Sequence, residues 1–404
     1  MQITGIVAEY NPFHNGHQYH VEQTRALQQT DGIIAVMSGN FTQRGETAVF
    51  DKWTRAQMAL QCGVDLVLEL PVAFAVRSAG YFASGAVQTL AATGVVDTLS
   101  CGVESANITE LEQLVTFLTS ESSEFQSALR HQLQLGLSFP SARQKALEQL
   151  QIAGSEQLQS PNNILALHYL QTIRQKQLPI QPLLISRLGS YDDDTVPAAS
   201  QGFASASAVR KLLQEENSLW QEQVPEPVEK IIHQQLQHGY LPMQNDNFSQ
   251  ILFTLLRRST PEELEQILEI KEGLENRIYT AAHQTESLSD LCAAIKSKRY
   301  TYTRIQRTLI HLLLNMTRQM DWQEPLYLRV LGFNSTGRKI LKEMKRKAQL
   351  PILIRPARQR NQLDGVAQQM LALDCRATNL YMLGYSLPFL RKPNLDLLQM
   401  PVQV

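Results

Sequence analysis

Hydrophobic and polar positions follow two different periods along the first third of the chain. Short β-branched apolar runs predict strands, and the longer amphipathic stretches between them predict helices. The predicted strands are Ile3–Ala8, Gly32–Met37, Asp65–Glu69, Val95–Ser100 and Pro182–Ser186, and the predicted helices are His17–Gln29, Asp51–Cys62 and Ser78–Ala92. Repeated units of this kind predict an α/β fold with a Rossmann-like, doubly wound parallel sheet. Its ligand site is expected beyond the carboxyl ends of the strands.

The remaining pattern is mostly helical. A helical insertion is predicted from about residue 109 to 175, and a second helical stretch from about 206 to 315. Leu326–Leu331 and Ile352–Ile354 are predicted strands on either side of a helix from about Ser335 to Ala348. With 404 residues, the chain is long enough for two domains. We expect them at 1–215 and 216–404, the second mostly helical with a small α/β portion.

Composition excludes several classes of protein. Hydrophobic residues make up 43% and charged residues 19%, which argues against disorder. The four cysteines, Cys62, Cys101, Cys292 and Cys375, form no C-x-x-C pair, so neither a zinc knuckle nor a disulfide framework is indicated. The amino terminus lacks a basic segment followed by an apolar one, and the most apolar stretch, Gly63–Val76, is interrupted by charges. We therefore expect a cytoplasmic protein without a membrane span.

The sharpest chemical signal lies between the first predicted strand and the first predicted helix, in the residues AEYNPFHNGH at 8–17. His14 and His17 flank Gly16, at a helix start whose free N–H groups attract anions. Two imidazoles there can donate hydrogen bonds to phosphate oxygens. The element resembles the H-x-G-H signature of the nucleotidyltransferase superfamily, whose members bind ATP and cleave it between the α- and β-phosphates.

Two other interpretations of this motif stay open. The histidines could merely line a turn, without any ligand. Two histidines three residues apart could also bind zinc, although the nearby additional donors are only Glu9 and His20.

A second element, FASASAVR at residues 203–210, resembles the superfamily's I-S-S-T-x-I-R type of motif. Ser205 or Ser207 can cap a helix whose amides, together with Arg210, meet phosphate. Helix capping without any nucleotide is the alternative.

Several longer motifs narrow the resemblance to one family. They are residues 5–17, SGNFTQRG at 38–45, DKWTR at 51–55, SPNNIL at 160–165 and KSKRYT at 296–301. Together they are similar to the bacterial tRNA(Met) cytidine acetate ligase family. The resemblance implies an enzyme that activates acetate with ATP as acetyl-adenylate. The acetyl group then passes to N4 of the wobble cytidine, position 34 of elongator tRNA(Met), giving N4-acetylcytidine.

The resemblance also implies site residues. His14 and His17 are the expected catalytic residues. The expected ATP-binding residues are Val7, Ala8, Glu9, Tyr10, Asn11, Pro12, Phe13, His14, Asn15, Gly16, His17, His20, Gly102, Asn162, Asn163, Arg187, Ser205, Ser207 and Arg210. Outside this context Gly102 would be an ordinary turn glycine after a strand, Asn162 and Asn163 would be helix caps, and Arg187 would form a surface ion pair.

Contacts to acetate or phosphate are expected from Asn40, Gln43, Arg44 and Lys52, which follow the second predicted strand. Alternatively, Asp51 caps the next helix and leaves Lys52 at its exposed end. Mg²⁺ is expected to accompany ATP. The acidic run Asp192–Asp194 could bind it or could be a solvated loop, and it stands where the family has an aromatic-His-Asp arrangement, so no histidine role transfers.

The net charge of −1 at first argues against a polyanion partner. Residues 296–360, however, hold 16 lysines and arginines against three acidic residues, so this segment carries +13 and the rest of the chain −14. Such segregation favours an RNA-docking surface over a merely solvated helix face, and Tyr300 and Tyr302 could stack on unpaired bases. The predicted tRNA-binding residues are Lys296, Lys298, Arg299, Tyr300, Tyr302, Arg304, Arg307, Arg338, Lys339, Lys342, Lys345 and Arg346.

Three functions therefore compete. The first is the ATP-dependent ligase acting on elongator tRNA(Met). The second is a nucleotidyltransferase for a small molecule, which would not need the basic segment. The third is a non-catalytic tRNA-binding protein, against which the intact histidine motif argues.

Overall fold

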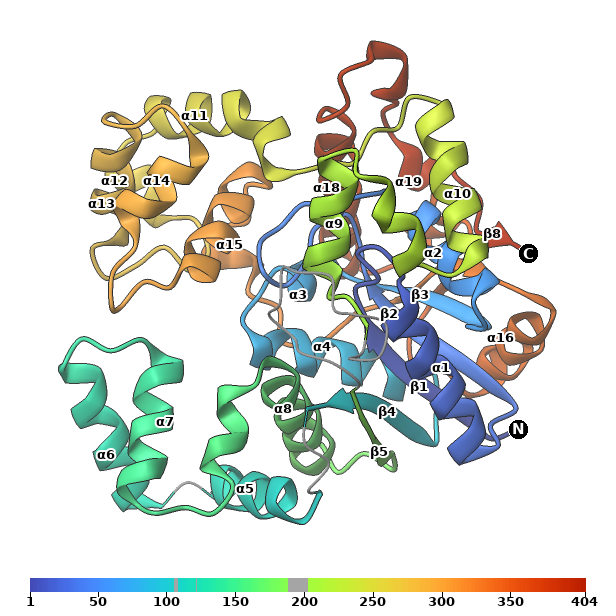
Figure 1. Cartoon of the computed structure of the whole chain (residues 1–404), viewed down its shortest axis with the longest axis horizontal. Helices are drawn as coiled ribbons and strands as arrows, with labels where there is room; N and C mark the ends of the chain where they lie inside the picture. The colour runs from blue at the N-terminus through green and yellow to red at the C-terminus, as the bar shows by residue number, and fades with distance from the viewer. Residues whose placement is uncertain (105–107, 121, 188–202) are drawn as a thin grey trace.

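A single sheet organises the computed structural model, which describes residues 1–104, 108–120, 122–187 and 203–404 (Figure 1). Its strands are β1 (Ile3–Ala8), β2 (Gly32–Ser38), β3 (Leu66–Leu70), β4 (Thr98–Val103), β5 (Gln181–Ser186), β6 (Leu328–Phe333), β7 (Ile352–Leu353) and β8 (Val402–Gln403). They lie in the order β5-β4-β1-β2-β3-β6-β7, and β8 pairs with β6.

The first five strands are mutually parallel, which confirms the predicted doubly wound sheet. Between β1 and β4 the strand order reverses direction, and a ligand crevice opens at such a point in this type of sheet. Several strand boundaries differ from prediction by one or two residues, and the largest difference is at β4, which begins three residues late, at Thr98. Asp97 just before it uses its carboxylate to accept the N–H of Ile3 at 3.0 Å. Gly102 consequently lies inside β4, and its interpretation as a turn glycine after a strand is wrong.

Helices cover both faces of this sheet. Right-handed crossovers place α1 (Asn15–Gln28) and α2 (Lys52–Gln61) on one face, with α4 (Ala79–Ala92) and α8 (Pro161–Gln175) on the other, where these two pack together. The predicted insertion is helical and contains α5 (Ile108–Ser120), α6 (Ser123–Gln134) and α7 (Phe139–Gln149), which precede α8.

The second helical stretch is also confirmed. Its helices are α9 (Ala206–Gln214), α10 (Glu226–Gln237), α11 (Ser249–Arg258), α12 (Pro261–Glu265), α13 (Leu274–Ala282), α14 (Leu288–Ile295) and α15 (Tyr302–Leu313). The other helices are the short α3 (Val72–Ala75), α16 (Ser335–Lys347), α17 (Pro356–Gln359), α18 (Gly365–Met382) and α19 (Leu395–Leu398). The pattern did not predict α18, whose inward face includes the polar Asp374 and Thr378.

The late strands do not build a sheet of their own. β6 pairs antiparallel with β3, and β7 and β8 then pair with β6. Every residue of β3 is buried, so this strand needs a partner on each side. The small α/β portion expected in residues 216–404 therefore extends the amino-terminal sheet, while the division at 215/216 stays a prediction. Across the residues that the structure describes, no helix is long and apolar enough to span a membrane.

Candidate active site

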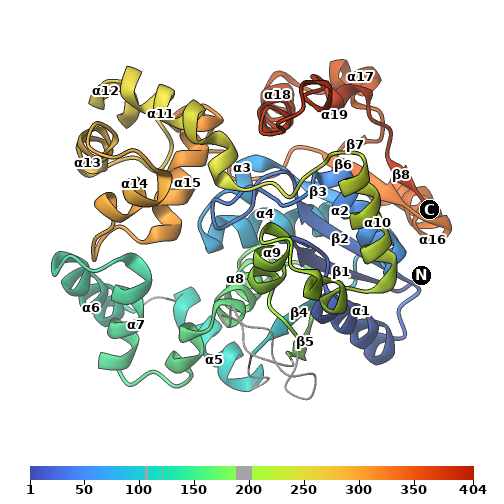
Figure 2. The same ribbon diagram turned by 45° about the horizontal axis from the view of Figure 1, so that its top comes forward.

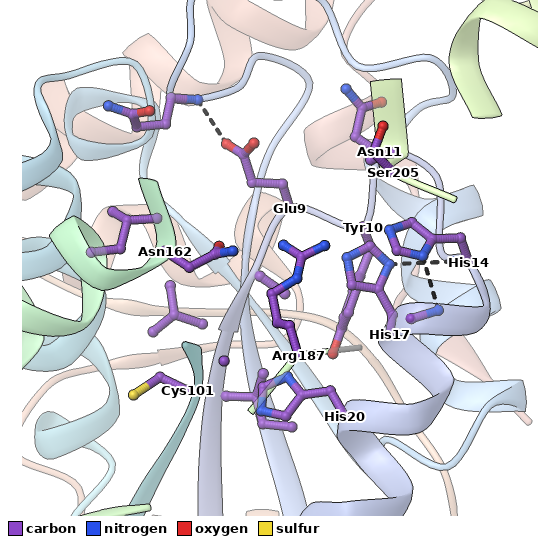
Figure 3. A pocket seen from close by; sticks show the side chains of 18 of the residues that line it. Glu9, Tyr10, Asn11, His14, His17, His20, Cys101, Asn162, Arg187 and Ser205 are labelled. Atoms are coloured by element: carbon purple, nitrogen blue, oxygen red, sulfur yellow. Dashed lines mark hydrogen bonds between the residues drawn. The ribbon is translucent and has the colours of Figure 1, made fainter. Parts of the chain in front are cut away.

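The histidine motif forms the first turn of α1. His14 is the N-cap, and its Nδ1 accepts a hydrogen bond from the backbone N–H of Gly16 at 3.0 Å. The Nδ1 of His17 in turn accepts the backbone N–H of His14 at 3.2 Å (Figure 3). Because each Nδ1 is an acceptor, each neutral ring carries its proton on Nε2. The two rings therefore present hydrogen-bond donors at a helix amino terminus.

The surroundings keep these rings uncharged. Burial, followed by the charges of Arg187 and Arg210, lowers the pKa of His14 to about 3. Burial and the neighbouring His14 lower the pKa of His17 well below its ordinary value. Burial and Arg187 lower the pKa of His20 to about 4. At neutral pH all three are neutral, so they can offer an anion hydrogen bonds but not positive charge.

The residues before the motif shape its backbone. The peptide bond between Asn11 and Pro12 is cis, and the Oδ1 of Asn11 accepts the N–H of Val49 at 2.7 Å. Phe13 is fully buried in the core. Asn15 points its amide away, donating to the carbonyl of Glu222 at 2.9 Å.

A cavity of about 220 Å³ opens beyond the carboxyl ends of β1, β4 and β5 (Figure 3). The predicted ATP-binding residues that line it are Val7, Ala8, Glu9, Tyr10, Asn11, His14, Gly16, His17, His20, Gly102, Asn162, Arg187, Ser205, Ser207 and Arg210. The predicted residues that do not line it are Pro12, Phe13, Asn15 and Asn163. The fold therefore gathers five separate segments of the chain around one space, as the nucleotide-binding prediction requires.

The two asparagines at the start of α8 do not cap that helix. Asn162 donates from Nδ2 to the carboxylate of Glu104 at 2.7 Å. Asn163 accepts the backbone N–H of Glu104 at 3.0 Å and donates to Gln157 at 2.7 Å. The capping interpretation is wrong for both, because Ser160 is the N-cap. Instead they tie α8 to the end of β4, with Asn162 facing the cavity.

The second motif meets the first directly. Ser205 caps α9 by accepting the N–H of Ala208 at 3.1 Å. Arg210 of the same helix donates to the carbonyl of Asn11 at 2.9 Å and pairs with Glu46 at 2.9 Å. Its guanidinium also donates to Ser207 Oγ at 3.2 Å. Residues 203–210 therefore both cap α9 and line the cavity.

The four candidates for acetate or phosphate contacts separate into two pairs. Gln43 and Arg44 line the cavity, whereas Asn40 and Lys52 do not. Lys52 is fully buried, and its Nζ donates to Glu69 at 2.7 Å and to Asp396 at 2.7 Å. Asp51 does cap α2, but the expectation that Lys52 then lies exposed is wrong.

Sequence reasoning missed part of the cavity wall. The further lining residues are Ile6, Tyr19, Glu46, Phe82, Cys101, Leu165, Tyr169, Ile185, Ser186, Phe203 and Ala206. Two of these residues could have been predicted from the sequence. Leu165 and Tyr169 follow Asn162 at helical spacing, which places them on the same face of α8. With Phe82 and Ile185 they give the cavity an apolar side, which suits a nucleobase.

The basic segment is less uniform than its sequence indicates. Tyr300 is buried and its hydroxyl donates to the carbonyl of Glu272 at 2.7 Å, so the expected stacking on a base is wrong for this residue. Arg307 is also buried, with its Nε 3.5 Å from the carboxylate of Glu269. Arg304 is partly buried. The exposed candidates in this part are Lys296, Lys298, Arg299 and Tyr302.

The other basic candidates, Arg338, Lys339, Lys342, Lys345 and Arg346, are exposed on α16. This helix lies at the amino-terminal end of the parallel strands. Ile340 packs against Gly32 at the start of β2, and Asn334 donates to Asp65, just before β3, at 2.9 Å. The cavity is at the opposite end, and Figures 1 and 2 show α15 and α16 on opposite sides of the molecule. The basic segment of residues 296–360, which was expected to form one RNA-docking surface, therefore contributes to two separate surfaces.

No group of three or more His, Cys, Asp or Glu side chains that could hold a metal occurs within the described ranges, including around His14 and His17. The run Asp192–Asp194 lies outside the described residues.

Comparison with known proteins agrees with this geometry. A sequence model of the family described as HIGH Nucleotidyl Transferase matches residues 1–393. The chain is 41% identical to the tRNA(Met) cytidine acetate ligase of Syntrophomonas wolfei, over 100% of this chain and 99% of that protein. It is 36% identical to the protein of the same name from Acetivibrio thermocellus, covering 99% of both.

Two solved structures are also similar to this fold. Thermotoga maritima TmcAL bound with alpha-thio ATP superposes with a TM-score of 0.93 at 35% identity, and the match covers all of both chains. The apo form of the same protein gives a TM-score of 0.95 at 36% identity, again over both whole chains.

Proposed function

The chain belongs to the HIGH nucleotidyl transferase family and to the tRNA(Met) cytidine acetate ligases, and we propose that it acetylates the wobble cytidine of elongator tRNA(Met) at N4, using ATP and acetate. The observation that carries this proposal is the histidine turn. His14 and His17 are neutral Nε2–H donors on one cavity that Arg187 and Arg210 also line.

The first step asks the protein to stabilise charge on phosphate. One carboxylate oxygen of acetate attacks the α-phosphorus of ATP, pyrophosphate leaves, and acetyl-adenylate remains in the cavity. The amino terminus of α1 and the two Nε2–H groups donate to the phosphate oxygens as negative charge develops on them. Arg187 supplies positive charge on the same cavity.

In the second step the N4 amine of cytidine attacks the acyl carbon, and AMP leaves. Gln43 and Arg44 lie on the loop side of the cavity and are the candidates for contacts to acetate or the acyl group. Asn40 and Lys52 have no direct part in this proposal, because both lie outside the cavity.

We also propose that Mg²⁺ accompanies ATP. Oxygen donors suit this ion, and the nucleotide's own phosphates would supply them, because no group of three or more His, Cys, Asp or Glu side chains that could hold a metal occurs among the described residues. When bound, Mg²⁺ neutralises charge on the leaving pyrophosphate.

For the RNA, we propose that the surface formed by Lys296, Lys298, Arg299 and Tyr302 lies nearest to the reacting base. Residues 41–47 carry Gln43, Arg44 and Glu46 into the cavity and pack on α15, since a side chain at Gly45 would meet the backbone of Arg307 at 2.3 Å. The α16 surface, at the other end of the sheet, would contact a distant part of the tRNA.

One assay tests the proposed function. The protein is incubated with ATP, labelled acetate and unmodified elongator tRNA(Met), and both pyrophosphate release and label in RNA are followed. We expect acetate-dependent pyrophosphate and label at N4 of the wobble cytidine. Pyrophosphate without labelled RNA would favour small-molecule transfer, and neither product would leave a tRNA-binding protein.

The salt dependence of tRNA binding tests the two basic surfaces one at a time. The triple variant Lys296→Ala, Lys298→Ala, Arg299→Ala should weaken tRNA binding and lower the slope of log affinity against log salt by about one unit per lost phosphate contact. The matched variant Lys342→Ala, Lys345→Ala, Arg346→Ala tests α16 in the same way. An unchanged slope in either variant would remove that surface from the proposed interface.

A further inference from the structure

Glu9 is the residue directly after β1, and its side chain lies on the cavity wall (Figure 3). One carboxylate oxygen, Oε1, accepts the backbone N–H of Gln43 at 2.7 Å and the hydroxyl of Ser38 at 3.3 Å. The other oxygen, Oε2, has no hydrogen-bond partner among the residues that the structure describes. The carboxylate is thus held by one oxygen, and the other is available to a ligand.

A buried arginine fixes the backbone around this carboxylate. Arg55 of α2 is fully buried and donates to the carbonyl of Glu9. The same guanidinium donates to the carbonyls of Ser38 and Gly39. The ends of β1 and β2 are therefore joined to one rigid group, which leaves little freedom in the position of Oε2.

The electrostatic surroundings favour a carboxylate that can take up a proton. Burial raises the pKa of Glu9 above its ordinary value, although the N–H of Gln43 lowers it. Among the charged neighbours, Glu46 raises that pKa, while Arg210 and Arg55 lower it. The result is a base closer in strength to neutral pH than an exposed glutamate, as proton transfer in a transition state requires.

We propose that Glu9 is the general base of acetyl transfer, accepting through Oε2 a proton from the N4 amine of cytidine. This inference rests on the proposed function. The nitrogen lone pair forms the new C–N bond to the acyl carbon, and the bond from that carbon to the phosphate oxygen breaks, releasing AMP. The proton lost by nitrogen goes to Glu9 and from there to solvent, so the cycle returns the carboxylate unchanged.

The position of Glu9 suits the second step better than the first. In the view of Figure 3, Glu9 lies above Arg187, whereas His14 and His17 lie to its right. The histidines contact the phosphates during adenylation, where attacking acetate has no proton to lose. Only the amine nucleophile of the second step must give up a proton, and Glu9 stands beside the loop of Gln43 that we assign to the acyl group.

A purely structural role for Glu9, holding the loop through Gln43, makes different predictions. Glu9→Gln keeps an oxygen that can accept the N–H of Gln43, but its amide cannot act as a base. We compare two rates in the full-length enzyme: acetate-dependent exchange of pyrophosphate into ATP, and single-turnover transfer from preformed acetyl-adenylate to tRNA. Transfer should fall about 10²-fold more than exchange. The wild-type rise of the transfer rate with pH, through the titration of Glu9, should also disappear.

The matched control is Glu46→Gln, which removes the same charge from the same cavity wall. We expect this variant to affect exchange and transfer by similar factors and to keep the pH dependence of transfer. Equal losses in both rates for Glu9→Gln, or a selective loss of transfer in Glu46→Gln, would overturn the proposal. Wild-type enzyme that transfers no acetyl group would refute the proposed function itself, so the two failures are distinguishable.

Discussion

Two glutamates at the carboxyl ends of β1 and β3, which flank β2 in the same sheet, have opposite surroundings. Glu9, after β1, has one carboxylate oxygen on the wall of the cavity that accepts no hydrogen bond from the described residues. Glu69, in β3, is 3% exposed, and its two oxygens accept from Lys52 Nζ at 2.7 and 2.8 Å. The same residue type at equivalent ends of strands is therefore a candidate reactive group in one case and a sealed ion pair in the other.

The difference comes from the carboxy-terminal part of the chain. Asp396 of α19 accepts from Lys52 at 2.7 Å and lies 3.3 Å from Arg329 of β6. We call Lys52, Glu69, Arg329 and Asp396 the buried ionic cluster. Burial alone would lower the pKa of Lys52, but the charges of Asp396 and Glu69 outweigh it and raise that pKa.

Over the end of β1, the described parts of α8, α9 and the loop of residues 41–47 surround a space instead of filling it. A buried charge with partners on all sides contributes to holding segments together, whereas a polar group on a cavity can meet a ligand. The comparison shows that the segment packed over the end of a strand, rather than the residue type there, decides whether a side chain at that end can meet a ligand.

The largest expected effect is in the buried ionic cluster. Lys52→Met leaves Glu69 and Asp396 without their shared cation, and we expect the free energy of unfolding to fall by about 3–5 kcal/mol. Urea titration measures this loss. Lys342→Met on the exposed face of α16 is the control and should stay within about 0.5 kcal/mol. A stable Lys52→Met variant that lacks adenylation would place Lys52 in the chemistry after all.

Next in size is the loss of the histidine donors. His14→Ala and His17→Ala should each slow acetate-dependent pyrophosphate exchange by about 10²–10³-fold, because each removes one donor to the charged transition state. Affinity for tRNA should be retained. His131→Ala, at an exposed position of α6, serves as the control. Loss of tRNA binding with normal exchange would contradict the assignment.

A pH dependence of stability follows from the neutral histidines. The pKa of His20 is lowered to about 4, whereas an unfolded histidine titrates near 6.5. Between these values the unfolded state takes up a proton that the folded state refuses, so stability falls as the pH is lowered from about 6.5 towards 4. One such group contributes a slope of up to about 1.4 kcal/mol per pH unit.

His20→Gln should remove that part of the slope while keeping a hydrogen bond to Ser100, whose hydroxyl lies 2.9 Å from Nε2 in the native protein. Urea titrations at several pH values measure the slope. An unchanged pH dependence in the variant would show that the pKa of His20 is the same in the folded and unfolded protein.

The smallest expected effect distinguishes two serines of α9. Ser205→Ala removes the N-cap and should lower the free energy of unfolding by about 1 kcal/mol. Ser207→Ala removes only an acceptor for Arg210, and its stability should stay within about 0.5 kcal/mol. Equal losses in thermal or urea unfolding would contradict the capping assignment.

Local patterns carried much of the prediction. β1 was predicted with its observed bounds, and the motif that follows it was correctly placed at the start of α1, because strand alternation and helix capping act over a few residues. The cavity was anticipated from motifs that each end a strand or begin a helix. Such signals are local in the chain and therefore readable from it.

Long-range pairing was not readable in the same way. Lys52 follows the end of a strand like a phosphate ligand, yet its partner Asp396 is 344 residues away. Tyr300 and Arg307 have the composition of an RNA surface but are buried by contacts to Glu272 and Glu269. α16 belongs to the basic segment in the sequence. In the structure it lies at the far end of the sheet, because β6, which precedes it, pairs antiparallel with β3.

The pairing of Lys52 with Asp396 also bears on how the protein is made. A ribosome adds roughly 5–20 residues each second, so about 20–70 seconds separate the synthesis of these partners. Until β6 is made, β3 lacks its outer neighbour, and until Asp396 is made, Lys52 and Glu69 lack the third member of their ion-pair network. The nucleotide-binding sheet therefore cannot mature as an early, independent module. Its completion waits until the chain around residue 396 has left the ribosome.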